Sequence, residues 1–239
     1  MNSSHRIAII LARGGSKRLP RKNLLDFFGK PLIAWTIEAA LESGCFEKVV
    51  VSTDDTEIAE TAVMYGAEAP FLRNSAADDF STSSQATYVG LMQSLEYWPH
   101  EYETVVQLMA NCPLRDSNDI VASINSFEMN NAPSQISCFK YGWMNPWWAA
   151  KIDSKGIPHR IFETTKNIRS QDLPNLYGPT GAIWISKVDD FLVSKDFYMK
   201  GHRFEELSLV SSMDIDDESD FEMAKALYIL KNRSVTCEK

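Results

Sequence analysis

The sequence predicts an α/β fold of three layers, with a doubly wound and mostly parallel sheet. Two patterns lead to this prediction. Residues 7–11 form an apolar run without polar alternation, as expected of a strand buried on both faces. Strand and helix patterns also alternate along the chain, which favours parallel strands joined by helices. With 239 residues and 44% apolar composition, the chain suits a single domain, residues 1–239.

The individual elements follow from local signals. A helix over 31–43 is expected because Pro31 suits a first helical turn and Gly44 a C-terminal cap. Asp54, followed three residues later by Glu57, is a capping-box pattern for a helix through Met64. The remaining expected elements are strands at 49–51, 104–109, 181–186 and 207–212, and helices at 83–97, 117–129 and 217–230.

The alternation breaks down between residues 134 and 179, where proline and aromatic residues dominate and no clean helix is predicted. Trp143, Trp147 and Trp148 lie within six positions. These tryptophans could belong to the core, or they could form an apolar patch that a partner covers. We therefore expect a small insertion in the domain here.

Composition argues against several classes of protein. The first apolar run is too short for a signal peptide, and no stretch reaches the length of a membrane span. The four cysteines are widely spaced without a CxxC pair, which favours free thiols: Cys45, Cys112, Cys138 and Cys237. We expect a cytoplasmic protein without a membrane or nucleic-acid partner.

The segment after the first strand, LARGGSKRLPRKN at residues 11–23, is the strongest functional signal. Gly14 and Gly15 allow backbone amides to approach an anion closely. Five cations share ten positions: Arg13, Lys17, Arg18, Arg21 and Lys22. Because the chain has a net charge of -8, this cluster points to a small polyanionic ligand rather than to nucleic acid. The loop matches neither a Walker A motif nor a dinucleotide-binding fingerprint, and a merely solvated basic loop is the alternative.

Two aspartates near the C-terminal end, Asp214 and Asp216, could bind a metal ion. They follow the expected strand at 207–212, and residues two apart lie on the same side of an extended chain. Carboxylates in this arrangement suit Mg²⁺. Helix capping is the alternative, and it is the interpretation we give to Asp217, Glu218 and Asp220.

Seven motifs in this order resemble the CMP-sialic acid synthetases, cytidylyltransferases that activate nonulosonic acids, which are nine-carbon 2-keto sugar acids. The likeness begins with ARGGSKRLPRKN and runs to about residue 230. The other motifs are STDDTEIAETAVMYGAE (52–68), FLR (71–73), DDFSTSS (78–84), CPLR (112–115), RSQDLPNLYGPTGAIWI (169–185) and SMDIDDESDF (212–221). The resemblance implies a Rossmann-like nucleotidyltransferase fold and Mg²⁺-dependent transfer from CTP to such an acid. It also implies a homodimer in which residues 134–179 form a dimerisation arm over the neighbouring subunit's site.

The resemblance also assigns roles by position. Arg13, Lys22, Asp214 and Asp216 would be catalytic, and the two aspartates would hold Mg²⁺. The nucleotide would contact Ala12, Arg13, Gly14, Gly15, Lys17, Asn23, Arg73, Ser81 and Ser83. The sugar would contact Met109, Asn111, Arg169, Gln171, Tyr177, Phe197 and Tyr198. Helix capping is an alternative for the two serines, and core packing for Phe197 and Tyr198. The four histidines receive no role.

Several departures from the family pattern concern the sugar. Met109 stands where sialic-acid members have a glutamine that binds the sugar, and DDFSTS resembles the pseudaminic-acid branch. Thr180 replaces a common asparagine, and Trp147 and Trp148 lie where sialate enzymes present a lysine. Legionaminic and pseudaminic acids, which are 9-deoxy sugars, therefore rank level with or slightly ahead of N-acetylneuraminic acid. A non-catalytic nucleotide-binding module is a further alternative, although retention of Arg13, Lys22, Asp214 and Asp216 argues against it.

Overall fold

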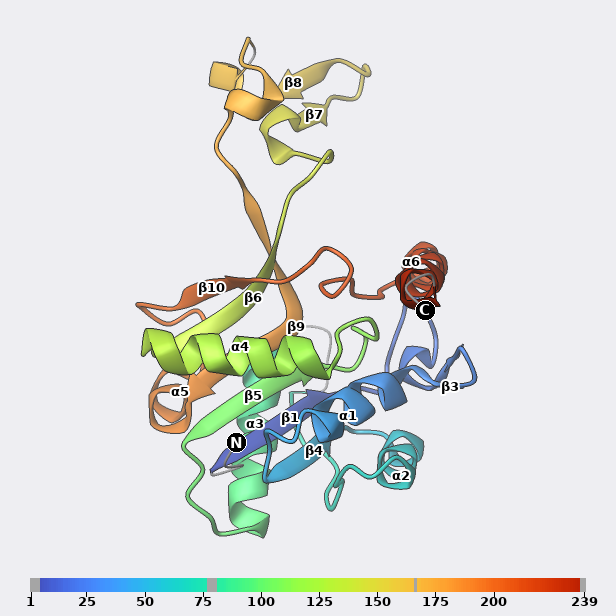
Figure 1. Ribbon diagram of the computed structural model, residues 1–239, viewed down its shortest axis with the longest axis vertical. Helices are drawn as coiled ribbons and strands as arrows, with labels where there is room; N and C mark the ends of the chain where they lie inside the picture. Colours follow the sequence, from blue (N-terminus) through green and yellow to red (C-terminus); the bar gives the residue numbers. More distant parts are fainter. Residues whose placement is uncertain (1–4, 77–80, 166, 237–239) are drawn as a thin grey trace.

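A six-stranded sheet forms the centre of the computed structural model, which describes residues 5–76, 81–165 and 167–236 (Figure 1). The strand order is β10-β6-β9-β5-β1-β4. The strands are β1 (Arg6–Leu11), β4 (Lys48–Ser52), β5 (Thr104–Met109), β6 (Ser134–Lys140), β9 (Tyr177–Lys187) and β10 (Arg203–Glu206). β1 pairs in parallel with β4 and β5, whereas β9 runs antiparallel between β5 and β6. The predicted mostly parallel sheet is confirmed.

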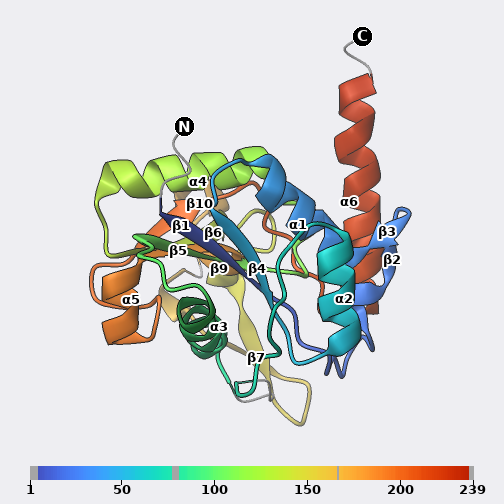
Figure 2. The same ribbon diagram turned by 90° about the horizontal axis from the view of Figure 1, so that it is seen from below.

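Helices cover both faces of this sheet, as Figure 2 shows, with α1 and α4 on one face and α3 and α5 on the other. The helices are α1 (Leu32–Glu42), α2 (Thr56–Met64), α3 (Ser83–Tyr97), α4 (Ser117–Asn130), α5 (Val188–Ser194) and α6 (Glu218–Thr236). Alternate residues of β1 serve the two layers. Ala8 and Ile10 belong to the core formed with α1 and α4, and Ile7 and Ile9 to the core formed with α3 and α5.

The C-terminal helix α6 packs outside the sheet on its own small core. This core includes Phe221 and Ala224 of α6, together with Phe27 of a short hairpin made of β2 (Asp26–Phe27) and β3 (Lys30–Pro31). The rings of Phe27 and Phe221 meet edge to face, 5.8 Å apart. This packing fixes the start of α6, and so the segment just before it, against the loop that follows β1.

An arm at residues 141–176 projects from the body between β6 and β9 (Figure 1). It contains η2 (Pro146–Trp148), β7 (Ala150–Ile152), β8 (Pro158–Arg160), η3 (Glu163–Thr165) and η4 (Ser170–Asp172). Trp147 holds it together by packing against Phe162 at 5.0 Å and donating a hydrogen bond to the Pro174 carbonyl at 2.8 Å. This arm lies within the expected insertion, whose bounds of 134 and 179 were too wide because β6 and the start of β9 belong to the sheet.

Two other expectations were wrong. Residues 207–212 form no strand, because the edge strand β10 ends at Glu206 and Ser208 then organises a turn. In that turn, Ser208 Oγ accepts from the Ser211 amide at 3.0 Å. The cap of α2 is Asp55 rather than Asp54, since Asp55 accepts from the Ile58 amide at 3.1 Å. The expected helices at 31–43, 83–97 and 117–129 and the strand at 104–109 are confirmed to within one residue.

Within the described residues, no helix combines the length and the apolar character needed to cross a membrane. The described cysteines, Cys45, Cys112 and Cys138, are buried free thiols. Burial is the main cause that raises the pKa of the Cys112 thiol to about 12, so this group stays protonated at neutral pH. Cys237 lies outside the described residues.

Candidate active site

A pocket of about 150 Å³ opens at the carboxyl ends of β1 and β5. Ligands of open α/β sheets bind at this edge. Seven residues that the sequence placed in the site line it together: Arg13, Lys17, Lys22, Asn23, Met109, Asn111 and Asp216. The remaining lining residues are Leu11, Ser16 and Arg18. The structure thus gathers cations, polar amides and a carboxylate from the first loop, β5 and the start of α6.

In the glycine loop, one backbone amide already donates to an anionic side chain. The Gly14 amide donates to Asp54 Oδ1 at 2.9 Å. A Cβ atom at Gly14 would lie 2.6 Å from Asp55 Oδ2, so a larger side chain would force this carboxylate to move. The buried Asn23 side chain holds the loop by donating to the Arg13 carbonyl at 3.0 Å. The Asp54 carboxylate therefore occupies the place at the loop where an anionic ligand would bind. From the sequence, Asp54 had been assigned to capping a helix.

Asp216 is the centre of charge in the pocket. Its Oδ1 accepts from Lys22 Nζ at 3.0 Å, and Arg18 lies 2.7 Å from its Oδ2. Burial alone would raise the pKa of Asp216, but the hydrogen bonds and charges of Lys22 and Arg18 hold that pKa below its ordinary value. Asp216 is consequently ionised at neutral pH. From the sequence, Arg18 was only one of five cations in the loop and had no assigned role. In the structure it contacts this carboxylate directly.

Asp214 is not among the residues that line the pocket, and Ile215, which lies between it and Asp216, is fully buried. Residues 213–216 form no strand, so the expected placement of the two carboxylates on one side of the chain stays a prediction. Asp214 is exposed, yet desolvation by the neighbouring protein atoms raises its pKa, and the negative charge of Asp216 raises this pKa further. A divalent cation would relieve this repulsion, and two carboxylates are the oxygen donors that Mg²⁺ prefers. The donor set fits a magnesium ion.

The neighbouring acidic residues cap α6, as predicted. Asp217 Oδ1 accepts from the amides of Ser219 at 2.9 Å and Asp220 at 3.1 Å. In return, Asp220 Oδ2 accepts from the amides of Asp216 at 2.9 Å and Asp217 at 3.1 Å. Glu218 lies in the first turn, where a negative charge is favourable. These residues fix the backbone that carries Asp216.

Arg73, Ser81 and Ser83, which were predicted to contact the nucleotide, do not line the pocket. Arg73 is 5% exposed and donates to the Ser52 carbonyl at 2.8 Å, at the end of β4. Burial lowers its pKa. Thr82, not Ser81 or Ser83, caps α3 in a reciprocal arrangement with Gln85, which corrects the capping alternative for both serines. The preceding residues Asp78, Asp79 and Phe80 lie outside the described residues.

The predicted sugar residues are divided among three places. Met109 and Asn111 line the pocket, and Asn111 donates to the Ile215 carbonyl at 2.9 Å. The Asn111 Oδ1 atom is buried and has no hydrogen-bond partner among the described residues, which leaves an acceptor for a ligand. Arg169, Gln171 and Tyr177 are exposed and do not line this pocket; Arg169 pairs with Asp172 at 2.7 Å.

Phe197 and Tyr198 were predicted to bind the sugar, with core packing as the alternative, and the structure places the two residues differently. Phe197 is fully buried, 5.5 Å from Trp184 between ring centroids, so its predicted role in binding the sugar was wrong and core packing describes it. Tyr198 is 42% exposed and packs edge to face on Trp184. Neither residue lines the pocket described above.

The fold and the charged pocket are those of a nucleotidyltransferase. The chain belongs to the cytidylyltransferase family, whose model matches residues 7–238. It is 36% identical over 233 residues to the pseudaminic acid cytidylyltransferase of Campylobacter jejuni, covering 95% of this chain and 98% of that protein. It is 33% identical over 235 residues to the CMP-N,N'-diacetyllegionaminic acid synthase of Legionella pneumophila, covering 96% and 98% of the two chains.

A third relative and two solved structures extend this comparison. Identity to the N-acylneuraminate cytidylyltransferase of Escherichia coli is 33% over 239 residues, covering 95% of this chain and 53% of that protein. The fold resembles that of a CMP:2-keto-3-deoxy-manno-octonic acid synthetase solved with CTP, with a TM-score of 0.69, 19% identity and coverage of 95% and 100%. It also resembles the 4-diphosphocytidyl-2C-methyl-D-erythritol synthase of Anaerococcus prevotii, with a TM-score of 0.63, 12% identity and coverage of 96% and 100%.

Proposed function

We propose that this chain transfers the cytidylyl group of CTP to a nonulosonic acid, forming a CMP-sugar and pyrophosphate. The observation that carries the proposal is that Lys22, Asp216 and Asn111 line one pocket beside the glycine loop. Family membership and the activities in the names of the relatives support the same reaction. A non-catalytic module would not need a half-buried, oriented Lys22–Asp216 pair at this edge.

In the proposed reaction, the anomeric hydroxyl of the sugar attacks the α-phosphorus in line and pyrophosphate leaves. The chain contributes position and charge more than covalent chemistry. Phosphate oxygens would replace Asp54 as acceptors of the Gly14 amide. Arg13, Lys17 and Lys22 would neutralise the charge that develops on the transferring group. Lys22 is held for this role by the Ile215 carbonyl, which accepts from its Nζ at 2.6 Å.

We further propose that Asp214 and Asp216 hold a magnesium ion when CTP is bound. The ion would neutralise phosphate charge and increase the acidity of a bound hydroxyl. Arg18 and Lys22, which pair with Asp216 in this structure, would then turn towards the phosphates. This exchange of partners would explain why two cations pair with the Asp216 carboxylate here.

For the sugar, we propose a 9-deoxy acid of the pseudaminic or legionaminic type over N-acetylneuraminic acid. The Met109 thioether lines the pocket and offers an apolar, adaptable surface where a glutamine would offer an amide. A hydroxylated tail would lose a polar partner there, whereas a methyl-bearing tail would not. The carboxylate and amide groups of the sugar would bind to Asn111 and to the cations of the loop.

We also propose a cytoplasmic homodimer without nucleic-acid or membrane partners. Free buried thiols are typical of a reducing compartment. The arm exposes apolar side chains, including Trp143 at 86% and Ile152 at 73%. Exposed apolar surface of this kind supports a contact with a second copy of the chain.

A pyrophosphate-release assay tests the proposed function. CTP or UTP would be supplied with each of the three sugars and Mg²⁺, and kcat/KM measured for every pair. We expect turnover with CTP far above that with UTP, and kcat/KM for the 9-deoxy acids at or above that for N-acetylneuraminic acid. Absence of turnover with every sugar would reject the reaction, while a clear preference for N-acetylneuraminic acid would reject only the proposed sugar.

A further inference from the structure

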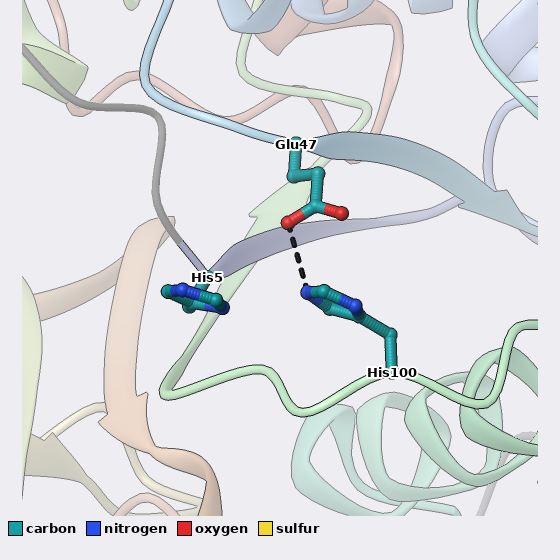
Figure 3. Close-up of side chains that lie close together, drawn as sticks. All are labelled: His5, Glu47 and His100. Atoms are coloured by element: carbon teal, nitrogen blue, oxygen red, sulfur yellow. Dashed lines mark ion pairs between the residues drawn. The ribbon is translucent and has the colours of Figure 1, made fainter.

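Three residues with metal-binding side chains meet at the end of the sheet opposite the pocket, where the central parallel strands begin (Figure 3). His5 precedes β1, Glu47 precedes β4, and His100 lies in the loop between α3 and β5. Backbone hydrogen bonds fix these segments to one another. The Glu47 amide donates to the Arg6 carbonyl at 2.9 Å, and the Glu103 amide to the His5 carbonyl at 2.7 Å.

The donor atoms already lie close together. One ring nitrogen of each histidine and one oxygen of Glu47 fall within 4.8 Å of one another. His100 Nε2 is 3.1 Å from Glu47 Oε2, and the two imidazole rings stack with centroids 5.4 Å apart and planes at 8°. Ligands of a tetrahedral zinc ion lie about 3.4 Å apart, as bonds of about 2.1 Å require. Small side-chain rotations would therefore complete the site.

Hydrogen bonding leaves a lone pair on His5, whereas His100 would release the proton that faces Glu47 when a metal binds. His100 Nε2 is buried and makes no aligned hydrogen bond within the described residues, although its distance from Glu47 is that of an ion pair. His5 Nδ1 lies 3.2 Å from the Glu101 carbonyl, which can only accept. Nδ1 of His5 is then the donor, and Nε2 is left with the lone pair. A backbone carbonyl in this role is the usual partner that fixes the tautomer of a metal-binding histidine.

The surroundings favour a cation. The cavity beside the cluster is lined by acidic side chains, among them Glu101, Glu103, Asp189 and Asp190, with Lys187 as a basic one. Nearby cations pair elsewhere: Arg6 with Glu128 at 2.5 Å and Lys48 with Glu68 at 2.8 Å. The His100 ring meets Tyr102 edge to face, and burial, with Glu47 and Glu68, raises the pKa of this phenol to about 12. Tyr102 therefore adds no negative charge.

We propose that His5, Glu47 and His100 bind a divalent first-row transition metal, with Zn²⁺ as the favoured ion and water in the fourth position. Two imidazoles and one carboxylate are an established zinc ligand set. The set differs from the oxygen-only pair Asp214 and Asp216, so the two sites select different metals. A bound ion would join the starts of β1, β4 and β5 and stabilise the folded chain.

The test is calorimetric titration of Zn²⁺ into the untagged, full-length chain after treatment with a chelator. The variants are His5→Gln, Glu47→Gln and His100→Gln. His159→Gln is the matched control, because His159 lies 3.1 Å from Asp153 in a similar pair that has no third ligand in the described part of the chain. We expect the Kd to rise at least tenfold in each of the three variants and to stay unchanged in the control. Circular dichroism checks that each variant is folded.

Two further measurements keep the proposal testable if one variant does not fold. Co²⁺ should give the visible absorption of a tetrahedral site in the parent chain but not in Glu47→Gln, the mildest change. Added Zn²⁺ should raise the melting temperature of the parent and of His159→Gln, and that of the cluster variants much less. Equal Zn²⁺ affinity in all chains, or no binding tighter than in a His5→Gln, His100→Gln double variant, would overturn the site.

Discussion

At the scale of single residues, Asp216 determines how the pocket is charged. Its carboxylate pairs with Lys22 at 3.0 Å and with Arg18 at 2.7 Å, while the adjacent Asp217 and Asp220 are committed to capping α6. Neighbouring aspartates thus have different roles because their oxygens meet different partners. Removing Asp216 should affect chemistry, whereas removing Asp217 should affect the helix.

We expect Asp216→Ala to lower kcat/KM by at least about a thousandfold, which corresponds to about 4 kcal/mol of barrier. The variant would lose the charge that orients Lys22 and that would hold the metal. Because the carboxylate is 38% exposed, its removal leaves no buried cavity, and circular dichroism should match the parent. Asp217→Ala is the control, with a lower melting temperature and turnover within about tenfold of the parent. Near-parent turnover in Asp216→Ala would leave this carboxylate without a catalytic role.

A second residue-scale prediction concerns Met109. A Cβ at Gly181 would lie 2.7 Å from Met109 Cγ, so the glycine gives this side chain its room. Glutamine has a similar length and should fit in the same space. We expect Met109→Gln to shift the kcat/KM ratio towards N-acetylneuraminic acid by about tenfold, because the amide can bind a hydroxylated tail. Met129→Gln, at a methionine 81% exposed on α4, is the control. An unchanged ratio in Met109→Gln would remove this residue from sugar selection.

At the scale of elements, buried polar residues explain why β6 was missed. Its sequence SQISCFK lacks the apolar run of β1, yet Ser134, Gln135 and Ser137 are buried. Each side chain donates a hydrogen bond to a backbone carbonyl. Ser134 donates to Phe197 at 2.6 Å, Gln135 to Ser123 at 2.8 Å, and Ser137 to Thr180 at 2.9 Å. Such bonds make polar residues acceptable in a core. Hydropathy patterns cannot reveal this, because the partners are distant in sequence.

In the candidate site, too, local sequence signals could be interpreted, whereas contacts between distant residues could not. The loop at residues 11–23 and Asp216 could be placed at one pocket because their signals are local in sequence. Asp54 was misassigned because a capping pattern and an anion-position carboxylate look alike until the loop at Gly14 is placed beside it. Phe197 was misassigned because an aromatic side chain carries no sign of whether it faces a ligand or the core.

An element-scale prediction concerns Asp116, which joins two helices. It caps α4 by accepting from the Asn118 amide at 3.0 Å, and it pairs with Lys231 of α6 at 2.8 Å. We expect Asp116→Ala to lower the free energy of unfolding by about 1 kcal/mol, mostly from the lost cap, since solvent screens a half-exposed ion pair. Urea unfolding at neutral pH measures this. Lys231→Ala is the control and should cost less.

The same pair gives a pH dependence. Burial opposes ionisation of Asp116, but the hydrogen bonds from Lys231 and the α4 amides lower its folded-state pKa below 3.8. Its stabilising contribution is therefore complete above that ordinary value and is lost as the pH falls through the folded pKa. The difference between parent and Asp116→Ala should stay constant from neutral pH to about pH 5 and shrink towards pH 3. A difference that grew on acidification would contradict this sign.

At the scale of the whole molecule, the arm presents apolar surface that one subunit does not bury. Trp143, Ile152 and Ile161 of this arm are 86%, 73% and 52% exposed, and the arm projects away from the sheet (Figure 1). We expect a homodimer in sedimentation experiments, and a dissociation constant raised at least tenfold by Trp143→Ala. Met129→Ala, at a similarly exposed methionine on α4, should leave the dimer intact. A fully active monomer would contradict the role proposed for the arm.

The last prediction asks whose pocket the arm serves. Arg169 and Gln171 line no part of the pocket in their own chain, so we expect them to complete the partner's pocket. Arg169→Ala would then impair the neighbouring pocket, and Asp216→Ala its own. Mixing the two inactive variants under conditions that exchange subunits should restore about a quarter of parent activity. Half of the dimers would be mixed, and each would hold one complete site. If each arm served its own chain, every pocket in the mixture would lack one group and no activity would return.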